Sequence, residues 1–448
     1  MLQNKLLRSW LLFALGALLL ANLMALVLVF LKLPILSVGL PLQSWFARTL
    51  VLHVDLSILI WALSVVALIW LLHIPQRLQI LDRVAMGLMF VSGASMLLSV
   101  LFGQGQPLLS NYIPVLDAPS YLFSLGGFVL AISIITLARV SVISSKWDQL
   151  PLSKKMFLLA LWAFIATVSV QLIAWWTLAP LVLNLQRAEQ LFWGAGHSLQ
   201  AVYLCMLLGG WFYLLERSGV SLALIARLAR HRIVIISVFS VIFTPLVISL
   251  AWAPDDPLYR QAFSIWMRLF SLPVLGVMSM LIWQLLGCSR QGLETSCLWR
   301  VSAVGLSMLL FFLGVVLGAM IRGDSLMVPA HYHATTGAVN LIFMAVIYDL
   351  LTAAKIEGSL QWQLKMYAAG VVLMVMGLAF SGVMGASRKL AASHEVTAYP
   401  AEMAAIVLMG IGAAIGLIAS FWFVIYAFRS LLAPGYGSSQ ISVSKVMS

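Results

Sequence analysis

The stretch PAHYHATTGAVNLIFMAVIYD, residues 329–349, decides the fold that this sequence predicts. It is long and apolar enough to cross a bilayer, which takes about 20 residues. A helix turns by about 100° per residue, so His331 and His333 point to nearly opposite sides of it. Two imidazoles placed in this way cannot easily share one small ion, but each can reach a different flat cofactor. The geometry suits two haems, one on either side of a single transmembrane helix.

The composition extends this prediction to the whole chain. Of 448 residues, 63% are hydrophobic and only 9% are charged, and the mean hydropathy is +1.06. A soluble domain carries about 25% charged residues, so we expect a polytopic membrane protein. The apolar runs are continuous and not alternating, which predicts helices and excludes an outer-membrane barrel. The net charge of +12 lies in short loops and does not indicate a nucleic-acid partner.

Hydropathy predicts an all-α membrane protein with about twelve transmembrane helices, in a single domain over residues 1–448. The polar residues 434–448 predict a loose C-terminal tail. Three cysteines at irregular spacing give neither a disulfide framework nor a metal motif. The predicted spans are 9–31, 49–73, 83–103, 119–139, 156–180, 189–214, 233–252, 258–286, 299–321, 330–353, 365–386 and 401–428.

Lys and Arg residues predict the orientation of the chain in the membrane. They gather in the loops on the side of the N-terminus, whereas the opposite loops carry far fewer. The positive-inside rule therefore places both termini in the cytoplasm, so even-numbered spans begin at the outer face. We expect the chain in the inner (cytoplasmic) membrane of a bacterium.

Four histidines fall at a similar depth in three of the predicted spans. His53 lies near the start of the second span, His197 in the sixth, and His331 and His333 at the start of the tenth. At about 1.5 Å per residue, all four lie in one shell in the outer half of the membrane. The alternative is that each is an ordinary interfacial histidine bonded to a neighbouring helix. Ionisable side chains within spans usually have a function, and the grouping of four favours a cofactor site.

With these residues, the chain resembles subunit I of the haem-copper oxidase superfamily, which includes cytochrome c oxidases, quinol oxidases and nitric oxide reductases. The resemblance spans essentially the whole chain, with histidines on the second, sixth and tenth of twelve helices. Four segments carry it: VPAHYHATTGAVNLIFMAV (328–346), NYIPVLDAP (111–119), FWGAGHSLQAVY (192–203) and GVMGASRK (382–389).

The resemblance implies two haems, expected to be of the b type. His53 and His333 would be the axial ligands of a low-spin haem, and His331 the single axial ligand of a high-spin haem. Two axial ligands leave no open position, so the first haem can only transfer electrons, whereas the second can bind a small molecule. Arg388 and Lys389 match the basic pair that holds haem propionates, although a serine and a lysine replace the usual proline and second arginine.

The chain departs from the family pattern where the second metal binds. His197 matches the family's histidine on the sixth helix and has Gln200 three residues on, but the seventh span has no histidine pair and the cross-linked tyrosine is missing. One imidazole and one amide make a poor site for copper or iron. We therefore predict no complete non-haem site and no tightly bound copper or non-haem iron. Arg268, about eleven residues into the eighth span, is expected to face this pocket.

Three functions are compatible with the sequence. The first is a haem-binding component of a respiratory oxidoreductase, of the terminal oxidase or nitric oxide reductase type, that passes electrons from a cytochrome c or quinol partner to O2 or NO. The chain has no cysteine-rich copper domain and no CxxCH motif, so small redox subunits would carry the electron entry port. The second is a non-catalytic haem relay or gas sensor, which the missing histidines favour. The third, a twelve-helix transporter, fits the helix count alone.

Overall fold

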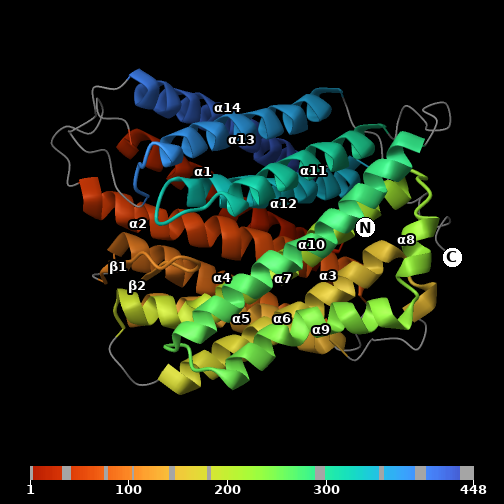
Figure 1. Cartoon of the computed structure of the whole chain (residues 1–448), viewed down its shortest axis with the longest axis horizontal. Coiled ribbons are helices and arrows are strands. Elements are labelled where there is room, and N and C mark those ends of the chain that lie inside the picture. Colours follow the sequence, from red (N-terminus) through yellow and green to blue (C-terminus); the bar gives the residue numbers. More distant parts are fainter. Residues whose placement is uncertain are drawn as a thin grey trace.

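The computed structural model describes residues 4–32, 42–74, 79–102, 105–140, 147–178, 183–287, 298–352, 358–388 and 400–433. Within them the chain is almost entirely helical, and the long helices lie side by side in one bundle (Figure 1). Twelve helices of this described part are long and apolar enough to cross a membrane. The prediction of an all-α membrane protein with about twelve spans is therefore confirmed. The predicted tail and Lys389 lie outside the described residues.

The second span contains a π-helical segment, η2, and the connection between α5 and α6 contains a 3-10 turn, η3. Together α2, η2 and α3 form one continuous span, Ser44–His73. The first elements are α1 (Lys5–Lys32), α2 (Leu42–Val54), η2 (Asp55–Trp61), α3 (Ala62–His73), α4 (Gln79–Phe102), β1 (Pro107–Leu108), β2 (Val115–Leu116), α5 (Pro119–Val140), η3 (Trp147–Gln149) and α6 (Leu152–Leu178). They are followed by α7 (Leu185–Arg217), α8 (Ala223–Leu228), α9 (Arg232–Ala251), α10 (Pro257–Gly287), α11 (Leu298–Ala319), α12 (Met327–Thr352), α13 (Gly358–Val383) and α14 (Pro400–Leu432).

The three spans that carry the four histidines form the core of the bundle. In the most apolar window of α7 and of α12, 83% of residues are buried, and 78% in the α2–α3 span, against 56% or less for each of the other candidate spans of the described chain. Helix α12 packs against α7, α11, α13 and α14. Its C-terminal part, residues 341–351, is buried on every side, because apolar side chains occupy all its faces except at Asp349. The histidines are thus held by the most enclosed helices.

A two-stranded hairpin, which the hydropathy pattern did not predict, joins α4 to α5. Pro107 pairs with Leu116 and Leu108 with Val115 in an antiparallel ladder. The Arg48 guanidinium on α2 donates a hydrogen bond of 2.8 Å to the Gly105 carbonyl just before this hairpin. The connection is therefore anchored to the start of the second span, beside His53.

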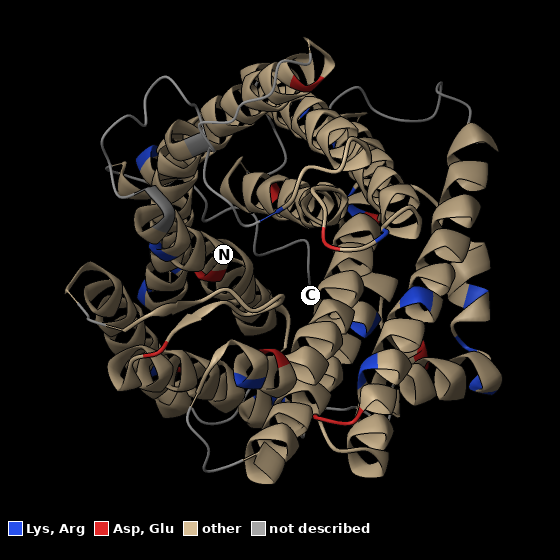
Figure 2. Cartoon of the chain, turned by 60° about the vertical axis from the view of Figure 1, so that its left-hand side comes forward, with Lys and Arg blue, Asp and Glu red and all other residues tan. Residues whose placement is uncertain are grey.

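Charged residues are sparse along the helices (Figure 2), and two buried groups of them form ion pairs. Arg139 on α5 donates two hydrogen bonds of 2.9 Å to the carboxylate of Asp82 on α4. Asp349 on α12 accepts from Arg300 on α11, 2.7 Å from Nε, and from Arg217 on α7 at 3.3 Å. A buried charge is tolerated only when a partner compensates its lost hydration. These pairs therefore join neighbouring helices at fixed positions.

Glycines allow the closest helix pair, α13 and α14, to bring their backbones together. A Cβ on Gly412 would stand 2.7 Å from Met374 Cα, and one on Gly370 would stand 2.7 Å from Gly416 Cα. Neither position has room for a side chain. Small residues at such positions are typical of membrane helices, whose association depends on close packing because lipid supplies no hydrophobic drive between them.

We expect Gly412→Leu to destabilise the bundle by about 1–3 kcal/mol, because the new side chain forces α13 and α14 apart. Gly410→Leu, two residues earlier on α14, is the matched control, since nothing lies within 4 Å of its added Cβ. The measurement is the midpoint of unfolding in increasing SDS for both variants and the parent. Equal midpoints for the two variants would contradict the packing argument.

Candidate functional site

A hydrogen bond sets His53 and His333 at the same level in the bundle. Trp61 Nε1 in the second span donates to Asn340 Oδ1 on α12 at 2.9 Å. His53 precedes Trp61 by eight residues and His333 precedes Asn340 by seven. The two spans cross in the same direction, so at about 1.5 Å per residue the histidines lie at nearly equal depth.

Two further contacts bring His197 and His331 to this level. The Tyr203 hydroxyl on α7 donates to the Ile58 carbonyl of η2, which places His197, six residues before Tyr203, beside the level of His53. Gly210 on α7 lies against Ile342 on α12, and His331 precedes Ile342 by eleven residues. His197 precedes Gly210 by thirteen, so the offset in depth is about 3 Å. The structure thus brings all four histidines into one layer.

Three of the imidazoles are held through the same ring nitrogen. Nδ1 lies 3.0 Å from the Ala21 carbonyl in His53, 2.6 Å from the Gly314 carbonyl in His331, and 2.8 Å from the Pro329 carbonyl in His333. A carbonyl can only accept, so each Nδ1 carries the proton and each Nε2 keeps its lone pair. Within the described residues, no hydrogen bond engages these Nε2 atoms. This is the arrangement of imidazoles that ligate a metal, with the second nitrogen fixed by a carbonyl.

Helix α12 has accessible surface around these histidines, although it lies at the centre of the bundle. His331, Tyr332 and His333 are partly exposed, as are Thr335 and Thr336 one turn on, whereas residues 341–351 are fully enclosed. Accessible side chains on a central helix border unfilled space. Because His331 and His333 point in different directions, this space borders two sides of α12. The donor set and the space fit a planar, nitrogen-ligated iron cofactor on each side.

Two glycines of α11 let α12 approach closely, and one of them, Gly318, makes room for the His331 ring, a feature that we did not predict from the sequence. A Cβ on Gly318 would stand 2.6 Å from His331 Nδ1, and one on Gly314 would stand 2.9 Å from the Thr335 nitrogen. The Gly314 carbonyl is also the acceptor for this imidazole. The available signal was the spacing of four residues in GVVLG, 314–318, which typifies close helix packing.

His197 differs from the other three, because both of its ring nitrogens have protein partners. Nδ1 lies 2.8 Å from the Trp193 carbonyl, and Nε2 lies 2.8 Å from the Tyr112 hydroxyl, which donates to it. Gln200 also hydrogen-bonds Tyr112, and burial raises the pKa of the Tyr112 phenol, so this phenol is a neutral donor. The rings of Trp193 and Phe263 pack around the imidazole. His197 therefore has no lone pair to offer a metal in this arrangement.

The structure does not bring Arg268 into this group. Its side chain is exposed on α10, and within the described chain the guanidinium forms no salt bridge or side-chain hydrogen bond. The expectation that its guanidinium faces the pocket is therefore wrong. Depth along the helix was readable from the sequence, but the direction of the side chain depends on which face of α10 packs inward. Phe263 and Trp266 point inward instead.

Arg388 lies in a polar network at the end of the bundle where α7 and α12 begin. It contacts the Asp324 carboxylate and donates to Asn111 Oδ1 at 2.6 Å. Asn111 in turn donates to Glu189 on α7 at 3.0 Å, and Glu189 pairs with Arg260 on α10 at 3.4 Å. The network fixes the connection that carries Tyr112. It also places a guanidinium, which suits carboxylates, at the end of the bundle where the histidines lie.

No group of three or more His, Cys, Asp or Glu side chains converges on one point within the described part of the chain. The site therefore consists of separate imidazoles from three core helices at one level. Imidazoles arranged in this way can each ligate a planar metal cofactor held between helices.

Comparison with known proteins agrees with this class. Residues 5–424 match the Cytochrome C and Quinol oxidase polypeptide I family. A haem-copper terminal oxidase solved as a dimer by cryo-EM has a TM-score of 0.75 at 19% identity, over 97% of this chain and 85% of that chain. An uncharacterized protein of Rickettsia prowazekii (strain Madrid E) is 25% identical over an alignment of 499 residues, 94% of this chain and 95% of the relative. An uncharacterized protein of Aquifex aeolicus (strain VF5) is 25% identical over 320 residues, 67% and 74% of the two chains.

The chain belongs to the cytochrome c and quinol oxidase polypeptide I family, and the resemblance seen in its sequence is confirmed. It is an integral membrane protein of the respiratory oxidoreductases, with haem as its cofactor. Members of the family work with cytochrome c or quinol donors and with O2. Membership also excludes the transporter alternative.

We expect Gly318→Ala to displace the His331 ring, because the added methyl group would lie 2.6 Å from Nδ1. Haem affinity on that side of α12 should fall on the order of tenfold, as is usual when the partner of a ligating imidazole is disturbed. The measurement is the CO difference spectrum of the reduced protein per mole of chain. Gly305→Ala on the same helix is the control, since its Cβ meets nothing within 4 Å. Equal CO spectra in both variants would contradict the assigned role of Gly318.

Proposed function

We propose that this chain binds two haems in the layer of its histidines, one between His53 and His333 and the other at His331. The observation that carries the proposal is the hydrogen-bond pattern common to these three imidazoles. In each, Nδ1 is hydrogen-bonded to a carbonyl and Nε2 is left for a ligand. The first pair of ligands comes from two spans that Trp61 and Asn340 hold in register. The third comes from the opposite side of α12.

When bound, the haems would supply electron transfer and the binding of a small gas molecule, O2 or NO. The protein would fix each imidazole by a carbonyl, so that its orientation does not change with the redox state. Arg388, with Asn111 and Asp324 around it, would bind the propionate groups at the outer end. Apolar side chains of α7 and α12 would exclude water from the haem sites.

We further propose that the chain holds no copper or non-haem iron beside the second haem. The support is chemical. Both ring nitrogens of His197 are hydrogen-bonded, one to the Trp193 carbonyl and the other to the Tyr112 hydroxyl. The rings of Trp193 and Phe263 beside it present carbon atoms, which do not ligate a metal. A metal at this position would require Tyr112 to leave, and the remaining donors would be one imidazole and the amide of Gln200. Such a set is poor for copper and for iron.

The partners follow from what the sequence lacks and from its charge distribution. The chain contains no CxxCH motif and no cysteine-rich domain, so small redox subunits would receive electrons from cytochrome c or quinol. The excess of Lys and Arg in alternate loops would place both termini in the cytoplasm and the histidine layer in the outer half of the membrane. The bacterial inner membrane is the expected location.

A second candidate function is a haem electron relay or a sensor of O2 or NO that does not reduce the gas. The capped His197 favours it, because the chain then lacks a second metal to share the reduction. Both functions predict the same haem ligands. They differ in turnover, since only the first consumes O2 or NO when an artificial donor supplies electrons.

The first test is the haem, copper and non-haem iron content of the detergent-purified chain. We expect two haems per chain by pyridine haemochromogen and less than a stoichiometric amount of either other metal. Consumption of O2 or NO with an artificial donor would then separate an enzyme from a relay. A full equivalent of copper or non-haem iron would contradict the assignment of His197, and an absence of haem would contradict the whole proposal.

Ligand variants assign the two haems separately. His53→Ala should abolish the low-spin spectrum and leave CO binding, because it removes one of two axial ligands. His331→Ala should abolish CO binding and leave the low-spin bands. His231→Ala, at an exposed residue before α9, is the control and should retain both. Loss of the same spectral bands in both ligand variants would contradict separate sites.

A further inference from the structure

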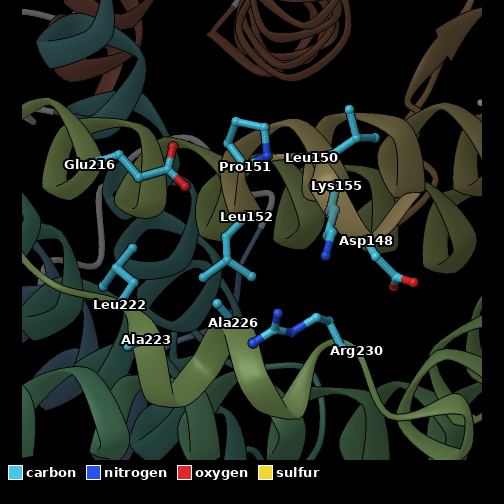
Figure 3. Close-up of a pocket in the computed structure, with 10 residues that line it drawn as sticks. All are labelled: Asp148, Leu150, Pro151, Leu152, Lys155, Glu216, Leu222, Ala223, Ala226 and Arg230. Carbon is cyan, nitrogen blue, oxygen red and sulfur yellow. The ribbon is translucent and has the colours of Figure 1, made fainter. Parts of the chain in front are cut away.

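A half-open pocket lies at the end of the bundle where α1 begins and α14 ends. It has a volume of about 290 Å³ and is enclosed by the start of α6, the end of α7, the short helix α8 and the η3 turn. Two cationic side chains extend into it from opposite walls, Lys155 from α6 and Arg230 from the turn after α8 (Figure 3). The pocket is unrelated to the histidine layer, which lies at the other end of these helices.

Lys155 is buried without a carboxylate partner. The residue is only 2% exposed, and within the described chain it forms no salt bridge or side-chain hydrogen bond. Its ammonium lies 5.7 Å from the centre of the Trp147 ring, a weak cation–π contact. Burying a charge without a partner is costly, and every other buried cation described above has a carboxylate. A bound anion from outside the described chain would therefore stabilise the ammonium.

Two carboxylates border the pocket, but neither lies between the two cations to neutralise their charge. Both Glu216 oxygens are engaged at the start of α6, where they accept from the Ser153 nitrogen at 3.2 Å and from its hydroxyl at 2.5 Å. Asp148 lies on the rim, close enough to interact with Lys155 electrostatically but without an ion pair, and its carboxylate points away from the gap (Figure 3). Lys155 and Arg230 thus face each other across open space.

We propose that this pocket binds a phosphate group, held between the Lys155 ammonium and the Arg230 guanidinium. A phosphate oxygen can accept from both cations at once, and a guanidinium suits its geometry. The wall beside the cations is apolar, with Leu152, Leu222 and Ala226, so the group attached to the phosphate can have an apolar part. Two sources share this chemistry, a phospholipid headgroup and a soluble phosphate compound. The basic run that begins at the end of α8, residues 227–232, would raise the local concentration of either.

The test uses the full chain, purified in detergent without added lipid, and follows its melting temperature. One arm titrates inorganic pyrophosphate against chloride at matched ionic strength. The other titrates short-chain phosphatidylglycerol against phosphatidylcholine of the same chain length. We expect a saturable rise in melting temperature in at least one arm. A rise with phosphatidylglycerol alone assigns a lipid headgroup, and a rise with pyrophosphate, with or without the lipid, assigns a soluble phosphate.

Variants locate the effect in the pocket. Lys155→Met should raise the half-saturating concentration on the order of tenfold, because one charge-assisted hydrogen bond is lost. Lys154→Met, at a lysine that does not line the pocket, should respond as the parent does. Arg230→Met at an exposed position tests the second cation without disturbing the core, with Arg227→Met as its control. No saturable response in the parent, or equal responses in each variant and its control, would overturn the proposal.

Discussion

The relative register of three parallel spans is the constraint on which the site depends. Each step of one residue along a helix moves a side chain by about 1.5 Å and turns it by about 100°, so a slip of one residue would remove a histidine from the layer. Polar contacts within the apolar bundle prevent such a slip. The indole of Trp61 finds its acceptor only at Asn340, and the Tyr203 hydroxyl finds the Ile58 carbonyl. In a medium without water, a lost partner is not replaced, so these bonds specify position more than they add stability.

The π-helical segment η2 belongs to the same arrangement. It begins at Asp55, two residues after His53, and includes both Ile58 and Trp61, the two residues that set the register. A π-turn widens the helix and changes which side chains and carbonyls point toward neighbours, and such turns occur frequently at functional sites. Its position lets one span meet α7 and α12 at once while His53 remains directed toward α1. The local irregularity and the shared level of the histidines thus have one structural origin.

The parts of this structure that the sequence predicted are those that depend on length and depth alone. Apolar runs of sufficient length gave the twelve spans, and counting residues gave the common level of His53, His197, His331 and His333. The direction of a side chain around its helix was not predictable in the same way, because it depends on packing partners. Arg268 is the example, since its side chain is exposed on α10 whereas the sequence placed it in the pocket. The Tyr112 contact was also out of reach, because an irregular connection carries it to His197 and no periodicity describes that path.

The use of ring nitrogens distinguishes the histidines more sharply than their positions do. Depth alone would make His197 equivalent to the other three, yet a neutral imidazole has one donor and one acceptor, and His197 uses both within the protein. The other three use only the donor. Ligation of a metal by His197 would first require the hydrogen bond from Tyr112 to break. The same accounting applies to the charges: Arg139, Arg300 and Arg217 are matched by carboxylates, whereas Lys155 is not. In both cases an unpaired donor or acceptor in a nonpolar interior is the basis on which we propose a ligand from outside the chain.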